Sequence, residues 1–430
     1  MKAFNEFFIS SIKFSIVAKT SFLSKPRLLE TFETISALVI FFILFMFTFQ
    51  GAKYINLYSL FDLKNALIIS LNILNLILLN KISNNFSKKL INWYSVNKRS
   101  LPWRNTKDSY KIWLSEIILQ QTQVKQGLPY YKKFIKLYPN VISLSKTSEQ
   151  DVLKNWEGLG YYSRARNLHK ASKIVVEKYN SIFPNSYNDL IKLPGIGDYS
   201  ASAISSFSNG ELHPVVDGNV YRFISRLFGI STIINTSSAL KEFKTLLNKL
   251  ISVNNPGDFN QAIMEFGALV CKPKAPDCKN CIYNKVCFSL KNHSVFDFPV
   301  KKKSSKPKTR FLNYFLIVDK NKKIMIEKRV KKDIWQNLFQ FPLIETDKNF
   351  NKSLIQDYLK SNNLPFLETT GLKLVETVSH KLSHQNLKIN FWINHVEKLN
   401  DSSVYVEELS NFPFPKPISS FIETFNKFLK

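Results

Sequence analysis

Cysteine is missing from nearly all of this 430-residue chain, because its four cysteines lie together as Cys271, Cys278, Cys281 and Cys287. A chain without cysteine elsewhere has no scattered disulfide framework of the kind that stabilises small secreted proteins. Structural zinc usually takes two Cys-x2-Cys pairs separated by a longer loop, whereas intervals of six, two and five residues suit one compact [4Fe–4S] cluster. The spacing therefore favours one iron–sulfur cluster, with zinc or a metal-free pair of disulfides as the alternatives.

Acidic residues are also scarce, with 32 Asp and Glu against 60 Lys and Arg and a formal net charge of +28. This imbalance argues against the mixed surface of an ordinary soluble enzyme. It attracts polyanions, and nucleic acid is the commonest polyanion that a cytosolic enzyme meets. Lys, Asn, Ile and Phe abound throughout, so compositional drift in an AT-rich genome is the competing explanation. Charge alone favours nucleic-acid binding, and the cysteine usage suits a reducing cytosol.

No apolar run reaches the roughly 20 residues that span a bilayer. The run Ile35–Phe49 approaches the lower limit of about 17, and Ala66–Leu79 falls short. Residues 1–84 therefore form a hydrophobic N-terminal extension with three interpretations: a membrane anchor, an accessory helix pair, or a misassigned start. We favour the misassigned start over the anchor, although no Met lies between Met46 and Met264 to begin a shorter chain. The expected location is the cytoplasm, associated with the nucleoid.

Beyond this extension the hydrophobic pattern divides the chain into two parts. Residues 85–290 have helical periodicity with no sustained alternation, and 291–310 form a basic linker that ends in Lys301–Arg310. Residues 311–430 contain short runs rich in β-branched and aromatic residues, with one helix near Asn351–Lys360. The predicted helices include Phe86–Val96, Tyr110–Gln126, Val152–Glu157, Ala165–Tyr179 and Ala239–Val253. The predicted strands are Phe311–Val318, Lys323–Arg329, Leu372–Val378 and Leu387–Val396.

A glycine-containing turn, Leu193–Gly197, separates the predicted helical stretches Tyr187–Lys192 and Tyr199–Ser206. Gly195 and Gly197 allow a tight backbone turn, so that successive N–H groups and the next helix N-terminus face an anion. This pattern matches the helix-hairpin-helix element, which grips a DNA phosphate without reading sequence. A plain turn between two helices is the alternative.

One carboxylate stands in an unusual context. Glu116 lies inside the largely apolar run Trp113–Leu119. Desolvation there would raise its pKa and keep it protonated near neutral pH, which makes it a candidate general acid. An isolated Glu would more often lie on the solvated face of an amphipathic helix.

Four motifs match one family in order and spacing. The segments Leu101–Arg104, Trp113–Val124, Gly158–His169 and Val216–Val220, followed by the cysteine loop, resemble the catalytic domain of adenine DNA glycosylases of the MutY type, in the endonuclease III superfamily. The resemblance implies a mainly α, helix-hairpin-helix domain that binds double-stranded DNA as a monomer. It also implies hydrolysis of the glycosidic bond of adenine mispaired with 8-oxoguanine or guanine.

The resemblance assigns three catalytic roles. Glu116 would protonate adenine N7, and Asp217 would stabilise the oxocarbenium-like sugar left behind. An N-cap role for Asp217 is compatible with this. The endonuclease III branch has a Lys nucleophile where this chain has Tyr199, which cannot form a Schiff base. The enzyme should therefore be monofunctional, with Tyr199 positioning the sugar and Asp217; a packed core tyrosine is the alternative.

Further positions match DNA contacts of the family. Gln121 and Tyr161 match the residues that wedge into the duplex beside 8-oxoguanine, with Tyr162 as the alternative aromatic. Arg99, Arg104 and Gln261 match positions near the adenine pocket. Arg164 and Arg166 are interpreted as phosphate contacts or solvated charges.

The C-terminal part resembles the MutT-like (Nudix-fold) module of the family, an α+β domain that verifies 8-oxoguanine. The match rests on Phe311–Glu327, Trp335–Pro342 and Ser379–His384. The REx2EE metal helix of Nudix hydrolases is missing, so no nucleotide hydrolysis is expected. Ser383 and His384 would bond the 8-oxo base, although the family's usual Phe-Ser-His is Leu-Ser-His here. A strand-edge Ser-His with no ligand is the alternative.

Three other functions compete with this one. An endonuclease III-like glycosylase/lyase would act on oxidised pyrimidines, but Tyr199 and the C-terminal module argue against it. A DNA-binding protein that has lost catalysis is disfavoured because Glu116 and Asp217 are both present. A membrane-tethered role would depend wholly on residues 1–84.

Overall fold

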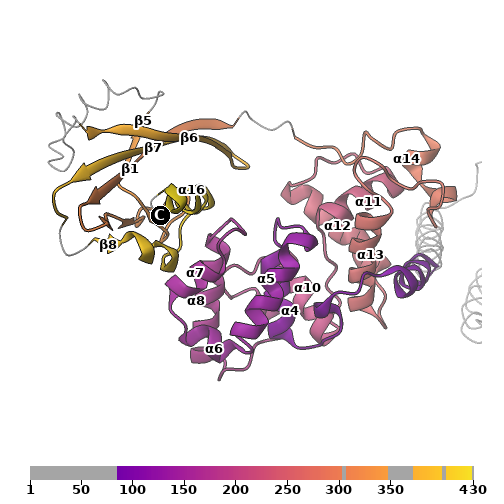
Figure 1. The fold of residues 1–430 in the computed structure, drawn as a ribbon. Coiled ribbons are helices and arrows are strands. Elements are labelled where there is room, and N and C mark those ends of the chain that lie inside the picture. Colours follow the sequence, from indigo (N-terminus) through magenta and orange to yellow (C-terminus); the bar gives the residue numbers. More distant parts are fainter. Residues whose placement is uncertain (1–84, 303–306, 347–370, 400–402, 429–430) are drawn as a thin grey trace, which may run out of the picture. The chain divides into compact units, whose positions relative to one another are not determined.

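The computed structural model describes residues 85–302, 307–346, 371–399 and 403–428 (Figure 1). The predicted N-terminal extension, with its two apolar runs, lies outside these residues, and so does the helix predicted at 351–360. Among the described helices, none has the length and apolar character needed to cross a bilayer. The described residues comprise a helical part and a part built on a β-sheet, as the sequence predicts.

The helical part begins with a helix over residues 85–97. Most of the helices that follow were predicted, and Asp217 does precede a helix. The elements are η1 (Pro102–Arg104), α4 (Ser109–Leu119), α5 (Val124–Leu137), α6 (Val141–Lys146), α7 (Glu149–Asn155), α8 (Ser163–Lys178), α9 (Tyr187–Leu190), α10 (Asp198–Asn209), α11 (Gly218–Phe228), α12 (Ser237–Leu250), α13 (Pro256–Leu269), η2 (Asn284–Val286) and α14 (Phe288–Lys291).

One predicted helix is wrong. The stretch Tyr110–Gln126 was expected to be continuous, but α4 ends at Leu119 and α5 begins at Val124. Gln121, between them, has φ +55°, a left-handed conformation that no helix interior accommodates. Apolar residues recur at the same helical spacing on both sides of the break, as at Ile117, Val124 and Tyr131. Hydrophobic periodicity alone therefore could not reveal the break.

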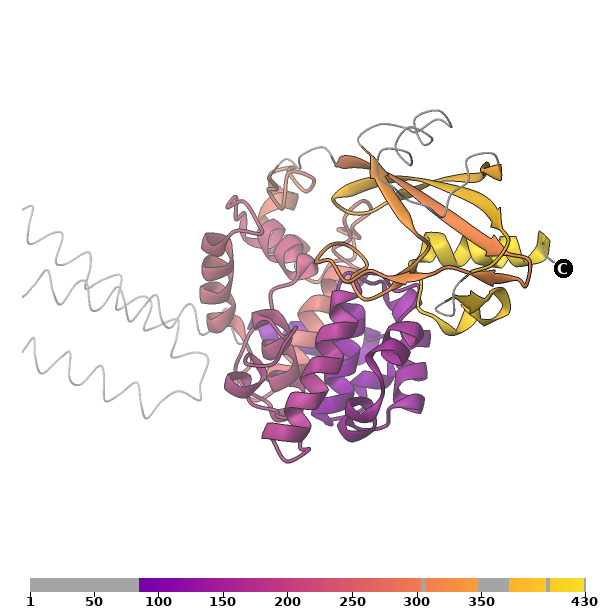
Figure 2. The same ribbon diagram turned by 90° about the vertical axis from the view of Figure 1, so that its left-hand side faces the viewer.

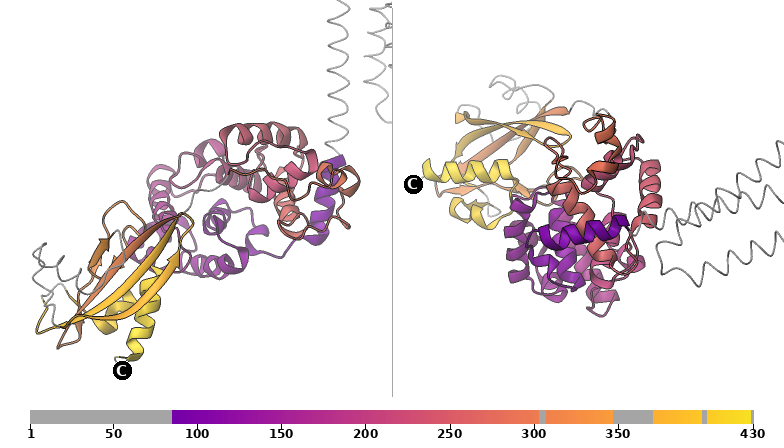
Figure 3. Two further views of the ribbon diagram at one scale, coloured as in Figure 1. Left: turned by 90° about the horizontal axis from the view of Figure 1, so that it is seen from above. Right: turned by 90° about the vertical axis from the view of Figure 1, so that its right-hand side faces the viewer.

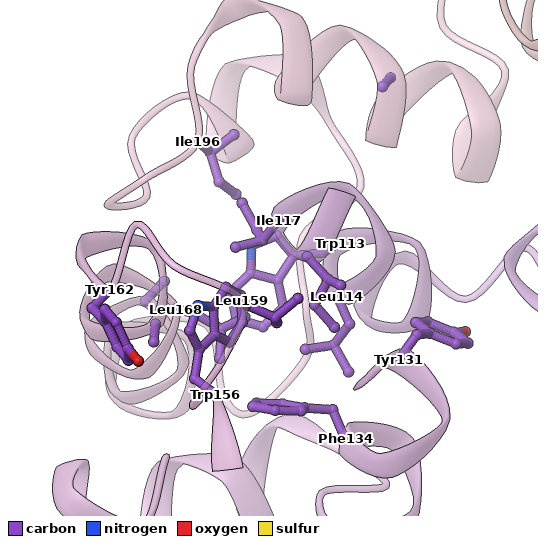
Figure 4. Close-up of a cluster of buried hydrophobic side chains, with 14 of the residues drawn as sticks. Trp113, Leu114, Ile117, Tyr131, Phe134, Trp156, Leu159, Tyr162, Leu168 and Ile196 are labelled. Carbon is purple, nitrogen blue, oxygen red and sulfur yellow. The ribbon is translucent and has the colours of Figure 1, made fainter. Parts of the chain in front are cut away.

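Helix α4 is the centre of the helical core. Nearly every residue from Tyr110 to Ile118 is buried, which is typical of a helix surrounded by others. Trp113, Leu114 and Ile117 project into a cluster with side chains from α5, α8 and the turn before α10, as Figure 4 shows. Trp156 and Phe134 meet edge to face in this cluster, with ring centroids 5.5 Å apart. The core thereby fixes the helix that carries Glu116.

The C-terminal part is a sheet with strand order β6-β7-β1-β2-β8, and β5 also pairs with β1. The central pair β1·β7 is parallel, whereas the other pairs in this sheet are antiparallel. A separate short ladder joins β3 to β4. The bounds are β1 (Lys308–Asp319), β2 (Lys323–Ile324), β3 (Glu327–Lys328), β4 (Phe339–Gln340), β5 (Leu343–Thr346), β6 (Lys373–Lys381), β7 (Gln385–Val396), β8 (Val404–Tyr405), η4 (Val406–Asn411) and α16 (Lys416–Phe428).

Helix α16 covers one face of this sheet (Figures 2 and 3). Phe421 of α16 stacks on Phe391 of β7 with ring centroids 4.0 Å apart. The predicted strand Lys323–Arg329 is instead two short strands, and β1 begins inside the predicted linker, at Lys308. The sequence analysis did not predict α16, although its apolar residues recur at helical spacing.

Candidate active site and cysteine pocket

Glu116 lies in the interior of α4, and its side chain is almost entirely buried, with 7% of the residue exposed. Burial raises its pKa to about 7, and the negative charge of Asp217 acts in the same direction. A hydrogen bond with Tyr199 and the positive charge of Arg104 act in the opposite direction. A carboxyl group with this pKa holds a proton in a large fraction of molecules at neutral pH, as a general acid must.

Asp217 is the N-cap of α11, as its position before a helix predicts. Its Oδ1 accepts hydrogen bonds from the backbone N–H groups of Asn219 and Val220, at 2.9 and 2.8 Å. Its Oδ2 accepts a third from Asn219 Nδ2 at 2.7 Å. Burial raises the pKa of Asp217, and these three hydrogen bonds oppose that effect because they favour the ionised form.

Tyr199 interacts electrostatically with both carboxylates, Glu116 and Asp217. Burial, and then the charges of Glu116 and Asp217, raise its pKa well above the ordinary value, so the phenol stays neutral. Its hydroxyl donates to Met264 Sδ at 3.2 Å. The structure thus brings Glu116, Asp217 and Tyr199 into one electrostatic group, and Met264 joins it from α13.

A carboxylate that the sequence analysis missed organises the two arginines assigned to the adenine pocket. Glu265 of α13 is 1% exposed and accepts bonds from Arg104 Nη1 and Nη2 at 2.8 and 2.7 Å. Arg99 adds its backbone N–H and its guanidinium, the closest contact being 2.6 Å. Burial opposes ionisation of Glu265, but these bonds together lower its pKa to about 2. The only sequence signal was a Glu within an otherwise apolar helix stretch.

Gln261 lies one helical turn before Glu265 on the same helix. Its Oε1 accepts a hydrogen bond from Tyr94 Oη at 2.9 Å. The Arg104 guanidinium lies over the Tyr94 ring, 5.4 Å from its centroid. The structure therefore places all three residues assigned to the adenine pocket, Arg99, Arg104 and Gln261, in one connected group.

The helix-hairpin-helix turn lies between α9 and α10. Gly195 has φ +79°, and a Cβ there would lie 2.8 Å from Asn167 Cβ, so glycine is required at this position. Gly197, the N-cap of α10, has an ordinary φ of −94° and open space around it. The sequence predicts that both glycines permit the turn, but only Gly195 does. Gly197 instead leaves the amides at the start of α10 uncovered.

Two exposed residues have left-handed backbone conformations. They are Gln121, between α4 and α5, and Tyr161, before α8, with φ of +55° and +47°. Tyr161 is 43% exposed, whereas Tyr162 is 6% exposed and packs in the core, so the geometry favours Tyr161 as the wedge aromatic. The expectation that Arg164 is a phosphate contact or a solvated charge is wrong, because Arg164 is 7% exposed. Arg166 is half-buried.

All four cysteines line one pocket, together with Arg226 and Tyr283. Arg226 Nη1 donates to Cys271 Sγ at 3.5 Å, and the Tyr283 N–H donates to Cys281 Sγ at 3.4 Å. N–H donors of this kind stabilise cluster-bound thiolates. Within the described residues, no three His, Cys, Asp or Glu side chains converge closely enough to hold one ion. Four thiols that line one pocket, with N–H donors beside two of them, are a donor set that suits an iron–sulfur cluster.

A run of hydrogen bonds links this loop to Asp217. Arg222 Nε donates to the carbonyl of Cys271 at 2.7 Å, and its Nη2 donates to Asn219 Oδ1 at 2.9 Å. Asn219 in turn donates to Asp217. The cysteine loop thus helps to fix the side-chain amide of Asn219, which orients the Asp217 carboxylate.

In the C-terminal part, Ser383 and His384 occupy the turn between β6 and β7. Both are exposed, and Ser383 Oγ lies 3.2 Å from His384 Nδ1. Leu382, which stands where the family has Phe, is partly buried against the core. Exposed polar side chains at a hairpin turn are free to contact a ligand.

Comparison with known proteins agrees with both parts of the fold. Residues 114–249 match the HhH-GPD superfamily of base excision DNA repair proteins, and residues 313–424 match the NUDIX domain. The chain is 36% identical over 349 residues to an adenine DNA glycosylase of Buchnera aphidicola subsp. Schizaphis graminum, covering 79% of this chain and 98% of that protein. It is 38% identical over 211 residues to the adenine DNA glycosylase of Homo sapiens, covering 47% of this chain and 39% of that protein. A solved thermostable thymine-DNA glycosylase shares 29% identity with a TM-score of 0.46, covering 50% of this chain and 98% of that one.

Proposed function

The chain belongs to the adenine DNA glycosylases, which are base excision repair enzymes, and we propose that it removes adenine mispaired with 8-oxoguanine or guanine in double-stranded DNA, leaving an abasic site. The observation that carries the proposal is the buried Glu116, with its pKa near 7, beside the hydrogen-bonded Asp217. Two carboxyl groups in such different environments suit an acid and an anionic stabiliser.

In the proposed reaction Glu116 donates its proton to adenine N7, so that the base leaves as a neutral species. Departure of the base puts positive charge on the sugar, and the ionised carboxylate of Asp217 stabilises that charge until water adds. The amides at the N-terminus of α11 favour the ionised form of Asp217, against the burial that raises its pKa. Arg104, held by Glu265, limits how far the pKa of Glu116 rises.

Tyr199 supports a monofunctional enzyme. A lyase needs an amine that can attack the sugar and form a Schiff base. Tyr199 has a neutral phenol instead, bonded to Met264 and interacting with Glu116. Its proposed role is to position the sugar and the two carboxylates.

Recognition of the mispair would involve two regions. Gln121 and Tyr161 are exposed on adjoining turns and would fill the gap left by the extruded nucleotide. Ser383 and His384 would bond the edge of 8-oxoguanine from the β6–β7 turn. The +28 charge supports non-specific attraction to duplex DNA.

Cys271, Cys278, Cys281 and Cys287 would hold one [4Fe–4S] cluster in their pocket. When bound, such a cluster cross-links the loop and supplies a centre able to exchange one electron. Arg222 and Asn219 connect the cysteine loop to the active site, because Arg222 donates to Asn219 and Asn219 donates to Asp217. We also expect the protein to act as a monomer on chromosomal DNA in the cytoplasm.

The test uses the full-length chain and duplexes with one adenine opposite 8-oxoguanine, opposite guanine or opposite thymine. The adenine strand is examined before and after hot alkali. Breakage only after alkali, in the two mispaired duplexes, is the expected result. Breakage without alkali would indicate a lyase, and equal breakage of the A·T duplex would contradict the proposed specificity.

A further inference from the structure

Arg164 is a buried cation bound entirely by backbone carbonyls. It is 7% exposed, and burial lowers its pKa to about 10, so it stays charged at neutral pH. Its guanidinium also lies 5.1 Å from the centroid of the Trp156 ring. Its hydrogen-bond acceptors are the carbonyl oxygens of Ile117 (3.0 Å), Ile118 (2.8 Å), Gln120 (2.6 Å), Leu159 (3.2 Å) and Gly160 (3.1 Å).

These acceptors belong to two separate segments of the chain. Nη1 bonds the carbonyls at the C-terminal end of α4 and the first residue after it. Nη2 bonds the two carbonyls just before Tyr161. The last carbonyls of a helix have no partner within the helix, and a cation there is favoured by the helix dipole. The Arg164 guanidinium therefore caps the C-terminal end of α4 and also binds the segment before Tyr161.

Each segment continues directly into one strained, exposed residue. Gln121 follows Gln120 with φ +55°, and Tyr161 follows Gly160 with φ +47°. A non-glycine residue in this region costs free energy and persists only where its surroundings hold it. The carbonyl immediately before each of these two residues is bonded to Arg164.

We infer that Arg164 is a positioning residue for base extrusion, because it fixes the spacing and direction of the Gln121 and Tyr161 side chains that enter the duplex. The inference rests on the proposed function, which supplies the duplex and the extruded adenine. Arg164 touches no substrate; it acts through the two segments and through the Tyr161 ring, whose centroid lies 5.8 Å from its guanidinium. The left-handed conformations aim both side chains outward, and the guanidinium keeps their backbones at one separation.

Arginine is the side chain that this arrangement needs. Its planar fork presents several N–H donors at fixed angles and no acceptor, so it suits a ring of carbonyl oxygens. Lysine keeps the charge but offers a single ammonium group, which cannot reach both segments in the same way. Arg164→Lys is therefore the informative change. Lys170→Gln, on the exposed face of α8, is the matched control for altering a cation on this helix.

The experiment measures single-turnover release of adenine opposite 8-oxoguanine in two duplexes. In one duplex the mispair is flanked by strongly stacked G·C pairs, and in the other by an adjacent mismatch that loosens the stack. We expect Arg164→Lys to lower the rate about tenfold in the first duplex, the order of one lost stacking contact, and much less in the second. Lys170→Gln should equal the wild type in both.

Two further variants separate positioning from general damage. Tyr161→Ala removes the wedge itself, so Arg164→Lys should add little loss in its presence, a non-additivity expected of groups that act as a unit. Gly160→Ala strains the segment before Tyr161, because Gly160 has φ +72°, which alanine rarely adopts. The added methyl group meets no neighbouring atom, and the Arg164 charge stays in place. It should show the same dependence on flanking pairs, which keeps the test available if Arg164→Lys folds poorly.

Base extrusion can also be followed without chemistry. In a Glu116→Gln background, 2-aminopurine in place of the adenine should brighten on binding, and Arg164→Lys should reduce that increase. Equal losses in both duplexes, full additivity with Tyr161→Ala and unchanged fluorescence would overturn the inference and leave the glycosylase activity standing. A wild-type protein that releases no adenine from either duplex would instead overturn the proposed function.

Discussion

Glu116 and Asp217 are both carboxylates, but they occupy different positions on their helices and have different hydrogen-bond partners. Glu116 lies in the interior of α4, where the backbone N–H groups around it are used by the helix itself. Asp217 lies at the N-terminus of α11, where two backbone N–H groups and one amide point at its oxygens. Burial raises the pKa of each carboxylate; Asp217 has three hydrogen bonds that oppose this rise, two of them from the backbone, whereas Glu116 has one, with the side chain of Tyr199.

Position along a helix is therefore one physical cause that can separate the two proposed chemical roles. A carboxyl group in a packed helix interior keeps its proton, whereas one at an N-cap is held as the anion. Nearby charges also change the pKa of Glu116: Arg104, which is held by Glu265, lowers it. The following experiments test how far this division accounts for the chemistry.

The largest effect is expected from Glu116→Gln, which keeps the shape of the side chain and removes the transferable proton. Release of adenine should fall by about 10²–10⁴-fold, the usual contribution of a general acid. Affinity for the mispaired duplex should survive, because the change removes no positive charge. Single-turnover release and a binding titration measure the two quantities. Glu177→Gln, on the exposed face of α8, is the matched control; retained turnover in Glu116→Gln would refute the acid assignment.

A smaller loss is expected from Asp217→Asn. Asparagine is as good an N-cap as aspartate, so α11 should keep its start, while the stabilising charge is lost. The rate should fall by roughly 10²–10³-fold, as when one electrostatic stabiliser is removed. Thermal unfolding should change only by the loss of the hydrogen bond that Asn219 Nδ2 donates to Asp217 Oδ2. A rate near that of the wild type would mean that Asp217 serves only as the cap of α11.

The local features behind this comparison were predictable from the sequence. Glu116 within an apolar run and Asp217 before a helix are patterns of neighbouring residues, and the structure has both where they were expected. The helical periodicity, and the runs rich in β-branched and aromatic residues, likewise predicted the order of most elements.

The supporting contacts were not predictable in the same way. Glu265 meets Arg104 across 161 positions of sequence, and Arg164 meets the carbonyl of Ile117 across 47. No spacing rule connects such residues, and a buried arginine bonded only to backbone carbonyls resembles an exposed one in a sequence. The break at Gln121 was missed because the bonds that hold it come from Arg164, on another helix.

The pH dependence of the rate tests the electrostatic support of Glu116. Because the acid form is required, release should decline as pH rises through about 7, the pKa of this group. Arg104→Gln removes a charge that lowers this pKa, so its decline should begin at higher pH, with a smaller change in rate at any one pH than either carboxylate substitution causes. Arg104→Lys, which keeps the charge, should leave the decline nearer its wild-type position. A shift to lower pH in Arg104→Gln would contradict the assigned interaction.

The last effect concerns stability and does not involve the reaction rate. The folded protein binds the Glu116 proton up to about pH 7, whereas the unfolded chain releases it near 4.5. The contribution of this group to stability is therefore complete below about pH 4.5 and is lost as pH rises to about 7, a difference on the order of 3 kcal/mol. Glutamine carries no such dependence, so the stability of Glu116→Gln relative to the wild type should increase between pH 5 and pH 8. Denaturant unfolding at the two pH values measures this, with Asp217→Asn for comparison. A constant difference would mean that Glu116 ionises in the folded protein as readily as in water, and the contrast between the two carboxylates would then need another cause.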